Sequence, residues 1–174
     1  MTFSIILGLC IIIALILWFV GYYYLLKYLT SVEEAWETIE EQFKRRHDMT
    51  DELRAVMQPH VALTNDVQDK LDEAIEGMVS PFNSRNEQMD ANDELAVLLR
   101  EVMESAQGHP ELVNDPDFKR IFAELDDSAY KIAAARKVYN NTVTKYNKKI
   151  QTMPTSFVAN VHHFTTREAV STAL

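Results

Sequence analysis

The chain has 174 residues, which is room for one domain besides a short membrane anchor. With only four glycines and five prolines, long segments contain no helix breaker, and we expect an all-α structure. The net charge of −9 is a poor match for nucleic acid, whose phosphates select basic surfaces. The single cysteine, Cys10, excludes an intramolecular disulfide and a thiolate-based metal site.

The first 26 residues carry no charged side chain. As a helix, the apolar run over residues 3–26 is long enough to cross a hydrocarbon core of about 30 Å. It lacks the basic flank and the small-residue cleavage site of a secretory signal. Aromatic residues gather at its far end, as is typical of a membrane interface: Trp18, Tyr22, Tyr23, Tyr24 and Tyr28. We predict a retained transmembrane anchor over residues 1–28, with residues 3–26 in contact with the lipid bilayer.

The basic residues next to this segment indicate its orientation. None precedes it, whereas Lys27 follows at once and residues 44–46 follow further on. Because loops rich in Lys and Arg stay in the cytoplasm, we expect a single-pass protein of the cell membrane with its N-terminus outside and its body cytoplasmic.

Apolar residues at spacings of three and four then run from Val32 to Met78 and predict a long helix that continues from the anchor or restarts at Thr30 and Ser31. Pro59 lies inside this pattern, and since the pattern resumes in phase we expect a bend there, not an end. A loop or short returning helix follows Ser80.

A third helix is predicted over residues 92–107, with Asn92 as its N-cap. Asp115 followed by Pro116 is a strong start signal for a last long helix that ends near Met153. Together these segments predict an elongated antiparallel, up-down-up-down helical bundle over residues 29–154, with a tail over residues 155–174. The tail could be an amphipathic element at the interface, a cap over the bundle, or disordered.

Opposite charges suggest a register for the two long helices. If residues whose numbers add to about 184 lie opposite one another, the lysines of residues 145–149 face the glutamates of residues 34–41, and Arg136 faces Asp48.

Two stretches of the chain carry distinctive motifs. The first is V-E-E-A-W-E-T-I followed by Q-F-K-R-R-H-D, over residues 32–48. The second is A-R-K-V-Y-N followed by Val143, Tyr146-Asn147, Ile150 and Pro154. Both resemble motifs of the LemA family, and residues 109–112 resemble that family's Y-P-x-L turn. The resemblance covers the whole chain in order, including a single span before the motifs. It implies an antiparallel helical bundle, and the link of some relatives to magnetosome membranes implies a role in membrane organisation.

The residues most distinctive of these motifs are our candidates for an interaction surface or for side chains that specify the bundle: Trp36, Gln42, Arg46, Arg136, Tyr139, Asn140, Tyr146 and Asn147. Tyr139 and Tyr146 are seven residues apart, as are Asn140 and Asn147, so each pair lies on one helix face. They could form a hydrogen-bond ladder across the bundle or a surface that recognises a partner.

Nothing in the sequence indicates an enzyme. It contains no glycine-rich phosphate loop, no H-E-x-x-H stretch and no evident nucleophile–base pair, and its histidines are not spaced as metal ligands. We therefore expect no cofactor and no metal. The predicted function is a non-enzymatic scaffold that binds itself or another protein at the membrane; the alternative is an adaptor subunit of a membrane protease or transporter. A hydrolase using Asp126 and Asp127 is a remote third possibility.

Overall fold

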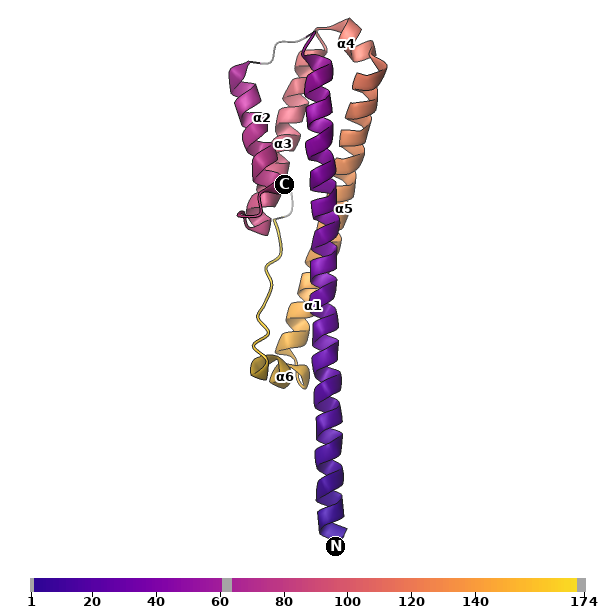
Figure 1. Ribbon diagram of the computed structural model, residues 1–174, viewed down its shortest axis with the longest axis vertical. Helices are drawn as coiled ribbons and strands as arrows, with labels where there is room; N and C mark the ends of the chain where they lie inside the picture. The colour runs from indigo at the N-terminus through magenta and orange to yellow at the C-terminus, as the bar shows by residue number, and fades with distance from the viewer. Residues whose placement is uncertain (1, 61–63, 172–174) are drawn as a thin grey trace. The chain divides into compact units, whose positions relative to one another are not determined.

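The computed structural model describes residues 2–60 and 64–171. Within these ranges the chain forms helices and no strand, which confirms the all-α class. Figure 1 shows the helices, which are α1 (Thr2–Met57), α2 (Asn65–Val79), α3 (Arg85–Ala106), α4 (Pro110–Asn114), α5 (Pro116–Gln151) and α6 (Thr155–Val161).

The contacts divide the chain into two compact units. We call residues 1–36 with 138–169 the anchor unit, and residues 37–137 with 170–174 the body unit. Helices α1 and α5 each contribute one part to each unit. The predicted boundaries after residues 28 and 154 both lie inside the anchor unit and stay a prediction, as does the complete up-down-up-down order of the bundle.

Helix α1 begins with a segment that is long and apolar enough to cross a membrane, and none of its most apolar window is buried. The helix passes Thr30 and Ser31 without a break. The Ser31 hydroxyl donates to the carbonyl of Lys27 one turn earlier (3.0 Å) and does not cap a new helix. Of the two predicted possibilities, one continuous helix from the apolar segment onward is therefore confirmed.

The expected bend at Pro59 is wrong. Helix α1 ends at Met57, residues 58–60 form a turn, and α2 begins at Asn65. The physical reason is the proline, which donates no N–H and disfavours a helical residue before it. The turn is closed by a bond from the Gln58 N–H to the Arg54 carbonyl (3.0 Å) and one from the His60 N–H to the Met57 carbonyl (2.9 Å).

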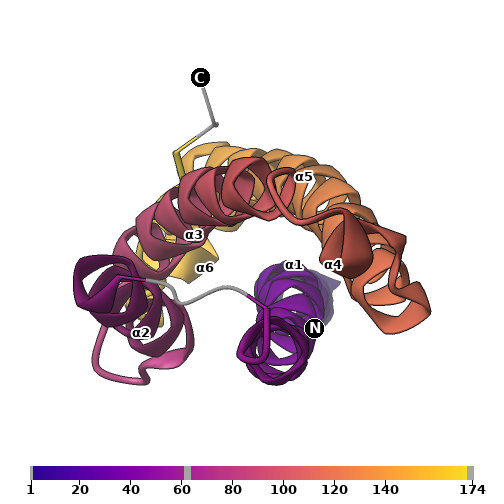
Figure 2. The same cartoon turned by 90° about the horizontal axis from the view of Figure 1, so that it is seen from above.

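In the body unit, α2 and α3 lie side by side, joined by a short turn (Figures 1 and 2). Helix α3 starts at Arg85, seven residues before the predicted start, because Ser84 and Glu87 form a capping box. Glu87 accepts from the Ser84 N–H (2.7 Å), and Ser84 accepts from the Glu87 N–H (3.3 Å). The core of this pair is made of buried apolar side chains: Leu71, Ala74, Ile75, Met78, Met89, Leu95, Leu98, Leu99, Val102 and Ala106.

The start predicted for the last long helix is confirmed. Asp115 Oδ1 accepts from the main-chain N–H groups of Asp117 and Phe118, both at 2.9 Å, and Pro116 is the first residue of α5.

Within the body unit, Arg45 of α1 pairs with Glu124 of α5 (3.2 Å), and Glu52 of α1 pairs with Arg120 of α5 (3.0 Å). The two helices run antiparallel, because the residue number rises along α1 while it falls along α5. The predicted register is wrong by about three helical turns. Arg136 pairs with Asp93 on α3, not with Asp48. Exposed charge pairs are too weak to decide a register, which the buried apolar faces of the helices determine instead.

In the anchor unit, the end of α5 is followed by α6, a turn at residues 162–163 and an extended tail over residues 164–169. The described residues at the start of α1 run on past α6 with no other described element beside them (Figure 1). The buried side chains of this unit come from α1, α5 and α6: Leu25, Val32, Trp36, Tyr139, Val143, Tyr146, Ile150, Val158 and Ala159.

Candidate functional site

The predicted site residues form two groups, one in each unit. Trp36, Tyr139, Asn140, Tyr146 and Asn147 belong to the anchor unit. Gln42, Arg46 and Arg136 belong to the body unit. We describe each group by itself.

In the anchor unit, three side chains of α5 hold the main chain of the tail. The Tyr146 hydroxyl donates to the carbonyl of Thr165 (2.9 Å), and the Tyr139 hydroxyl donates to the carbonyl of Glu168 (3.0 Å). Asn147 makes two bonds to Arg167, donating from Nδ2 to its carbonyl (2.8 Å) and accepting its N–H on Oδ1 (2.9 Å). We call these three residues the tail clamp.

The tail clamp recognises an extended backbone and not a side chain. The side-chain amide of Asn147 bonds to both the main-chain N–H and the C=O of Arg167, as a residue on a neighbouring β-strand would do. Both tyrosines are about 1% exposed, and their hydroxyl groups are satisfied by the main-chain carbonyls of the tail. Burial raises the pKa of Tyr146, which keeps its hydroxyl protonated as a donor.

Further contacts complete this group. The ring of Trp36 meets that of Tyr139 edge to face, with 5.4 Å between centroids. Arg167 forms an ion pair with Glu33 of α1 (3.4 Å), and the carbonyl of half-buried Asn140 accepts from Thr144 (2.8 Å). The hydrogen bonds of Tyr139, Tyr146 and Asn147 tie α5 to the tail, whereas the predicted ladder crosses the bundle. Residues 155–171 are ordered, so disorder of the tail is wrong for them.

In the body unit, a buried polar chain links three helices. Arg46 on α1 donates to the side-chain oxygen of Asn92 on α3 (2.6 Å). Asn92 donates to Asp93 (3.0 Å), and the same carboxylate oxygen accepts from Arg136 on α5. The side chain of Arg136 is 6% exposed, and Arg46 is 2% exposed.

This chain brings two guanidinium groups near one carboxylate: Arg136 bonds to Asp93 directly, and Arg46 is linked to it through Asn92. Burial lowers the pKa of Arg46 to about 10, partly offset by Asp93, so the group stays charged at neutral pH. Among the described residues, Nε of Arg46, Nε of Arg136 and Oε1 of half-buried Gln42 have no hydrogen-bond partner. Such networks select one helix pairing more than they add stability, which fits a bundle-specifying role.

A cavity of about 310 Å³ adjoins Arg46 in the body unit and is lined also by Arg100 and Asp126. The neighbouring Asp127 instead pairs with Lys131 (2.6 Å). The two carboxylates of the remote hydrolase hypothesis therefore make different contacts. Within residues 2–60 and 64–171, no group of three His, Cys, Asp or Glu side chains could hold a metal ion.

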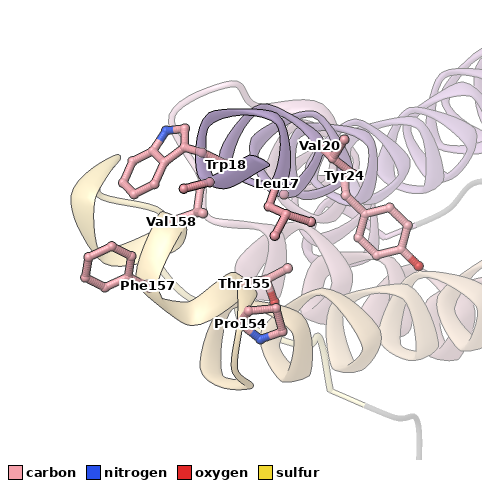
Figure 3. Close-up of a pocket in the computed structure, with 10 residues that line it drawn as sticks. Leu17, Trp18, Val20, Tyr24, Pro154, Thr155, Phe157 and Val158 are labelled. Atoms are coloured by element: carbon pink, nitrogen blue, oxygen red, sulfur yellow. The ribbon is translucent and has the colours of Figure 1, made fainter. Parts of the chain in front are cut away.

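A second feature of the anchor unit is an apolar groove of about 560 Å³ between α1 and α6 (Figure 3). It is lined almost entirely by apolar side chains: Ala14, Leu17, Trp18, Val20, Gly21, Tyr24, Pro154, Thr155, Phe157 and Val158. Figure 3 shows α6 beside α1, with Leu17 directed towards Pro154 and Thr155. At one end Trp18 Nε1 donates to Nε2 of His162 (3.2 Å). We call this feature the α1–α6 groove.

The family model for LemA matches residues 35–173. The chain belongs to the LemA family. No curated protein matches it. The LemA match includes the residues of the tail clamp, of the buried polar chain and of the tail. The apolar segment over residues 3–26 lies outside the matched range.

Sequence reasoning on this LemA chain missed the partners of its own candidates. Asn92 is predicted to cap a helix, but it is a buried residue inside α3. Its partner Asp93 is not among the predicted candidates. The available signal was the position of Arg46 and Arg136 within predicted bundle helices, since an arginine that becomes buried there requires a nearby carboxylate. The tail was missed as the acceptor for Tyr139, Tyr146 and Asn147, since its sequence shows no strand-like alternation.

Proposed function

We propose that this LemA protein is a non-enzymatic scaffold anchored in the cell membrane, which holds a second copy of itself or another protein there. The observation that carries the proposal is helix α1. One uninterrupted helix contains both the apolar segment and the buried residues Val32, Trp36 and Ile39. A helix that is exposed and apolar at one end and packed at the other supports an anchor that continues directly into a folded body.

The basic residues of the anchor unit support a cytoplasmic body. The positive-inside rule counts residues near the end of a span, and the chain alone offers only Lys27 there. The fold adds Lys149, whose Nζ lies 5.5 Å from the centroid of the Tyr24 ring. Lys148, also in the last turn of α5, is the neighbouring residue. These positions favour an external N-terminus.

Contact with a partner is best supported on the body unit. Phe82, at the turn between α2 and α3, is 96% exposed, and Tyr130 on α5 is 77% exposed. Aromatic side chains of this kind are enriched where proteins bind one another, and the acidic body disfavours nucleic acid. The alternative, an adaptor for a membrane enzyme, would use the same exposed side chains and differs only in the identity of the partner.

The test is photocrosslinking in intact membranes with a photoreactive amino acid in place of Phe82 or Tyr130. Crosslinks between two copies support the scaffold, and crosslinks to one other membrane protein support the adaptor. A probe at exposed Tyr23 in the apolar segment is the matched control and should label lipid. Absence of protein crosslinks from both body positions, with lipid labelling intact at the control, contradicts the proposed interaction.

Topology has its own test. In a Cys10→Ser background, a membrane-impermeant thiol reagent should label Thr2→Cys in intact cells. It should label Ser105→Cys on α3 only after the cells are lysed. Labelling in the reverse order would place the body outside.

A further inference from the structure

The two units differ in charge. Residues 1–36 and 138–169 carry five Lys or Arg and three Asp or Glu, a formal charge of +2, whereas the whole chain carries −9. The body unit therefore carries −11. A chain that is acidic as a whole would be repelled by anionic lipid, but its anchor unit is basic.

The α1–α6 groove belongs to this basic unit and lies on the apolar segment itself. Its α1 residues, between Ala14 and Tyr24, are within the run predicted to contact lipid. On the other side, α6 buries Val158 and Ala159 but leaves Phe157 59% exposed and Val161 50% exposed. Phe157 lines the groove, with its ring 5.6 Å from that of Trp18, centroid to centroid. Helix α6 thus combines buried and exposed apolar side chains, as an element in the membrane interface does.

Cationic groups stand at one end of the groove. Tyr24 lines the groove and carries Lys149 over its ring, and Lys27 is three residues further along α1, on the same face as Tyr24. The Thr155 hydroxyl, also in the lining, donates to the carbonyl of Lys149 (2.6 Å) and fixes α6 to the end of α5. Among the described residues, neither lysine forms an ion pair with a carboxylate.

We propose that the α1–α6 groove binds one acyl chain of an anionic phospholipid, whose phosphate group is held by Lys27 and Lys149. The inference rests on the proposed membrane anchoring. An apolar groove of about 560 Å³ is within the size range of ligand sites, and hydrocarbon is the medium that surrounds it. The unpaired lysines at its mouth select a negative headgroup over a zwitterionic one.

The experiment uses the tryptophan in the lining as the reporter. The chain has two tryptophans, so Trp36→Phe leaves Trp18 alone. The full chain is reconstituted in phosphatidylcholine nanodiscs that contain brominated phosphatidylglycerol or, at the same mole fraction, brominated phosphatidylcholine. Bromine on an acyl chain quenches tryptophan fluorescence on contact. We expect stronger quenching of Trp18 by the anionic lipid, and a loss of that preference by about fivefold in Lys149→Gln.

Two matched controls separate a site from general attraction. Lys148→Gln removes the same charge one residue away, on another helix face, and should retain most of the preference. Ala14→Phe places a ring in the groove and should abolish the preference, whereas Ile13→Phe, next to it but outside the lining, should not. If Trp36→Phe does not fold, native mass spectrometry of the unmodified chain, counting retained phosphatidylglycerol, gives the same comparison.

The failures are distinguishable. Equal quenching by both lipids, or equal loss in Lys148→Gln and Lys149→Gln, shows only nonspecific surrounding lipid and overturns the site. Quenching by neither lipid shows that Trp18 is not in the bilayer, which contradicts the membrane anchoring as well.

Discussion

Replacing Asn147 with alanine tests the tail clamp directly. The change removes two hydrogen bonds, both to the main chain of Arg167. Each such bond contributes about 0.5–1 kcal/mol at a solvent-accessible position, so docking of the tail should weaken by about 1–2 kcal/mol. This corresponds to about a 5- to 30-fold larger population of the released tail.

Limited trypsin digestion measures this population, because Arg167 is itself a trypsin site and its main chain is held in the docked state. Where opening is fast relative to cleavage, the rate of release of peptide 168–174 tracks the open population. We therefore expect Asn147→Ala to release the peptide about 5- to 30-fold faster, while the melting temperature of the body unit stays unchanged. Thr144→Ala, an exposed change one turn earlier on α5, should cleave at the original rate. Equal rates for Asn147→Ala and the unchanged protein would refute the clamp.

Three further predictions concern stability. Asp93→Ala should lower the free energy of unfolding by about 3 kcal/mol in urea titrations, because it leaves buried Arg136 without its carboxylate. The double variant Asp93→Leu with Arg136→Met removes both charges and should recover at least half of that loss. The Ser84 hydrogen bonds hold the pKa of Glu87 below its usual value near 4.5. The contribution of Glu87 to the helix cap is therefore complete above that pH and is lost as the pH falls through the lower pKa. Glu87→Gln should lack this loss, which is measured as the difference in the free energy of unfolding between the two proteins across pH 3–6. Trp36→Ala should cost about 3–5 kcal/mol, read from thermal melting, since Trp36 is 4% exposed and its ring packs edge to face against Tyr139.

Much of the helical structure follows from local chemistry in the sequence. Asp115-Pro116 set the start of α5, and the unbroken apolar run set the start of α1. These predictions are confirmed because each depends on a few neighbouring residues and on no distant contact. The capping box of Ser84 and Glu87 is equally local and could have been found, had it been weighed against Asn92 as the start of α3.

Other features depend on contacts between distant residues, which local patterns do not encode. The break at Pro59 was not predicted, because the spacing of apolar residues is the same before and after it. Helices α1 and α2 each need one apolar face whether or not they are continuous, so this spacing does not show where one ends. The α1–α5 register was inferred from exposed charges, whereas Arg136 takes its partner from α3. Three of the candidate residues, Tyr139, Tyr146 and Asn147, contact the tail, but their partners are main-chain groups of residues 165–168, which carry no signal in the sequence.

The way the tail is held bears on how this protein can change in evolution. The side chains of the tail clamp bond to peptide groups, which are the same in every residue except proline. Thr165 and Glu168 can therefore accept almost any replacement while the segment stays bound, whereas a proline at Arg167 would remove the N–H that Asn147 needs. Insertion of a single residue between Thr165 and Glu168 would put those two carbonyls out of step with Tyr146 and Tyr139. For residues 165–168, the number of residues between the bonded peptide groups is therefore constrained, whereas most side chains can vary.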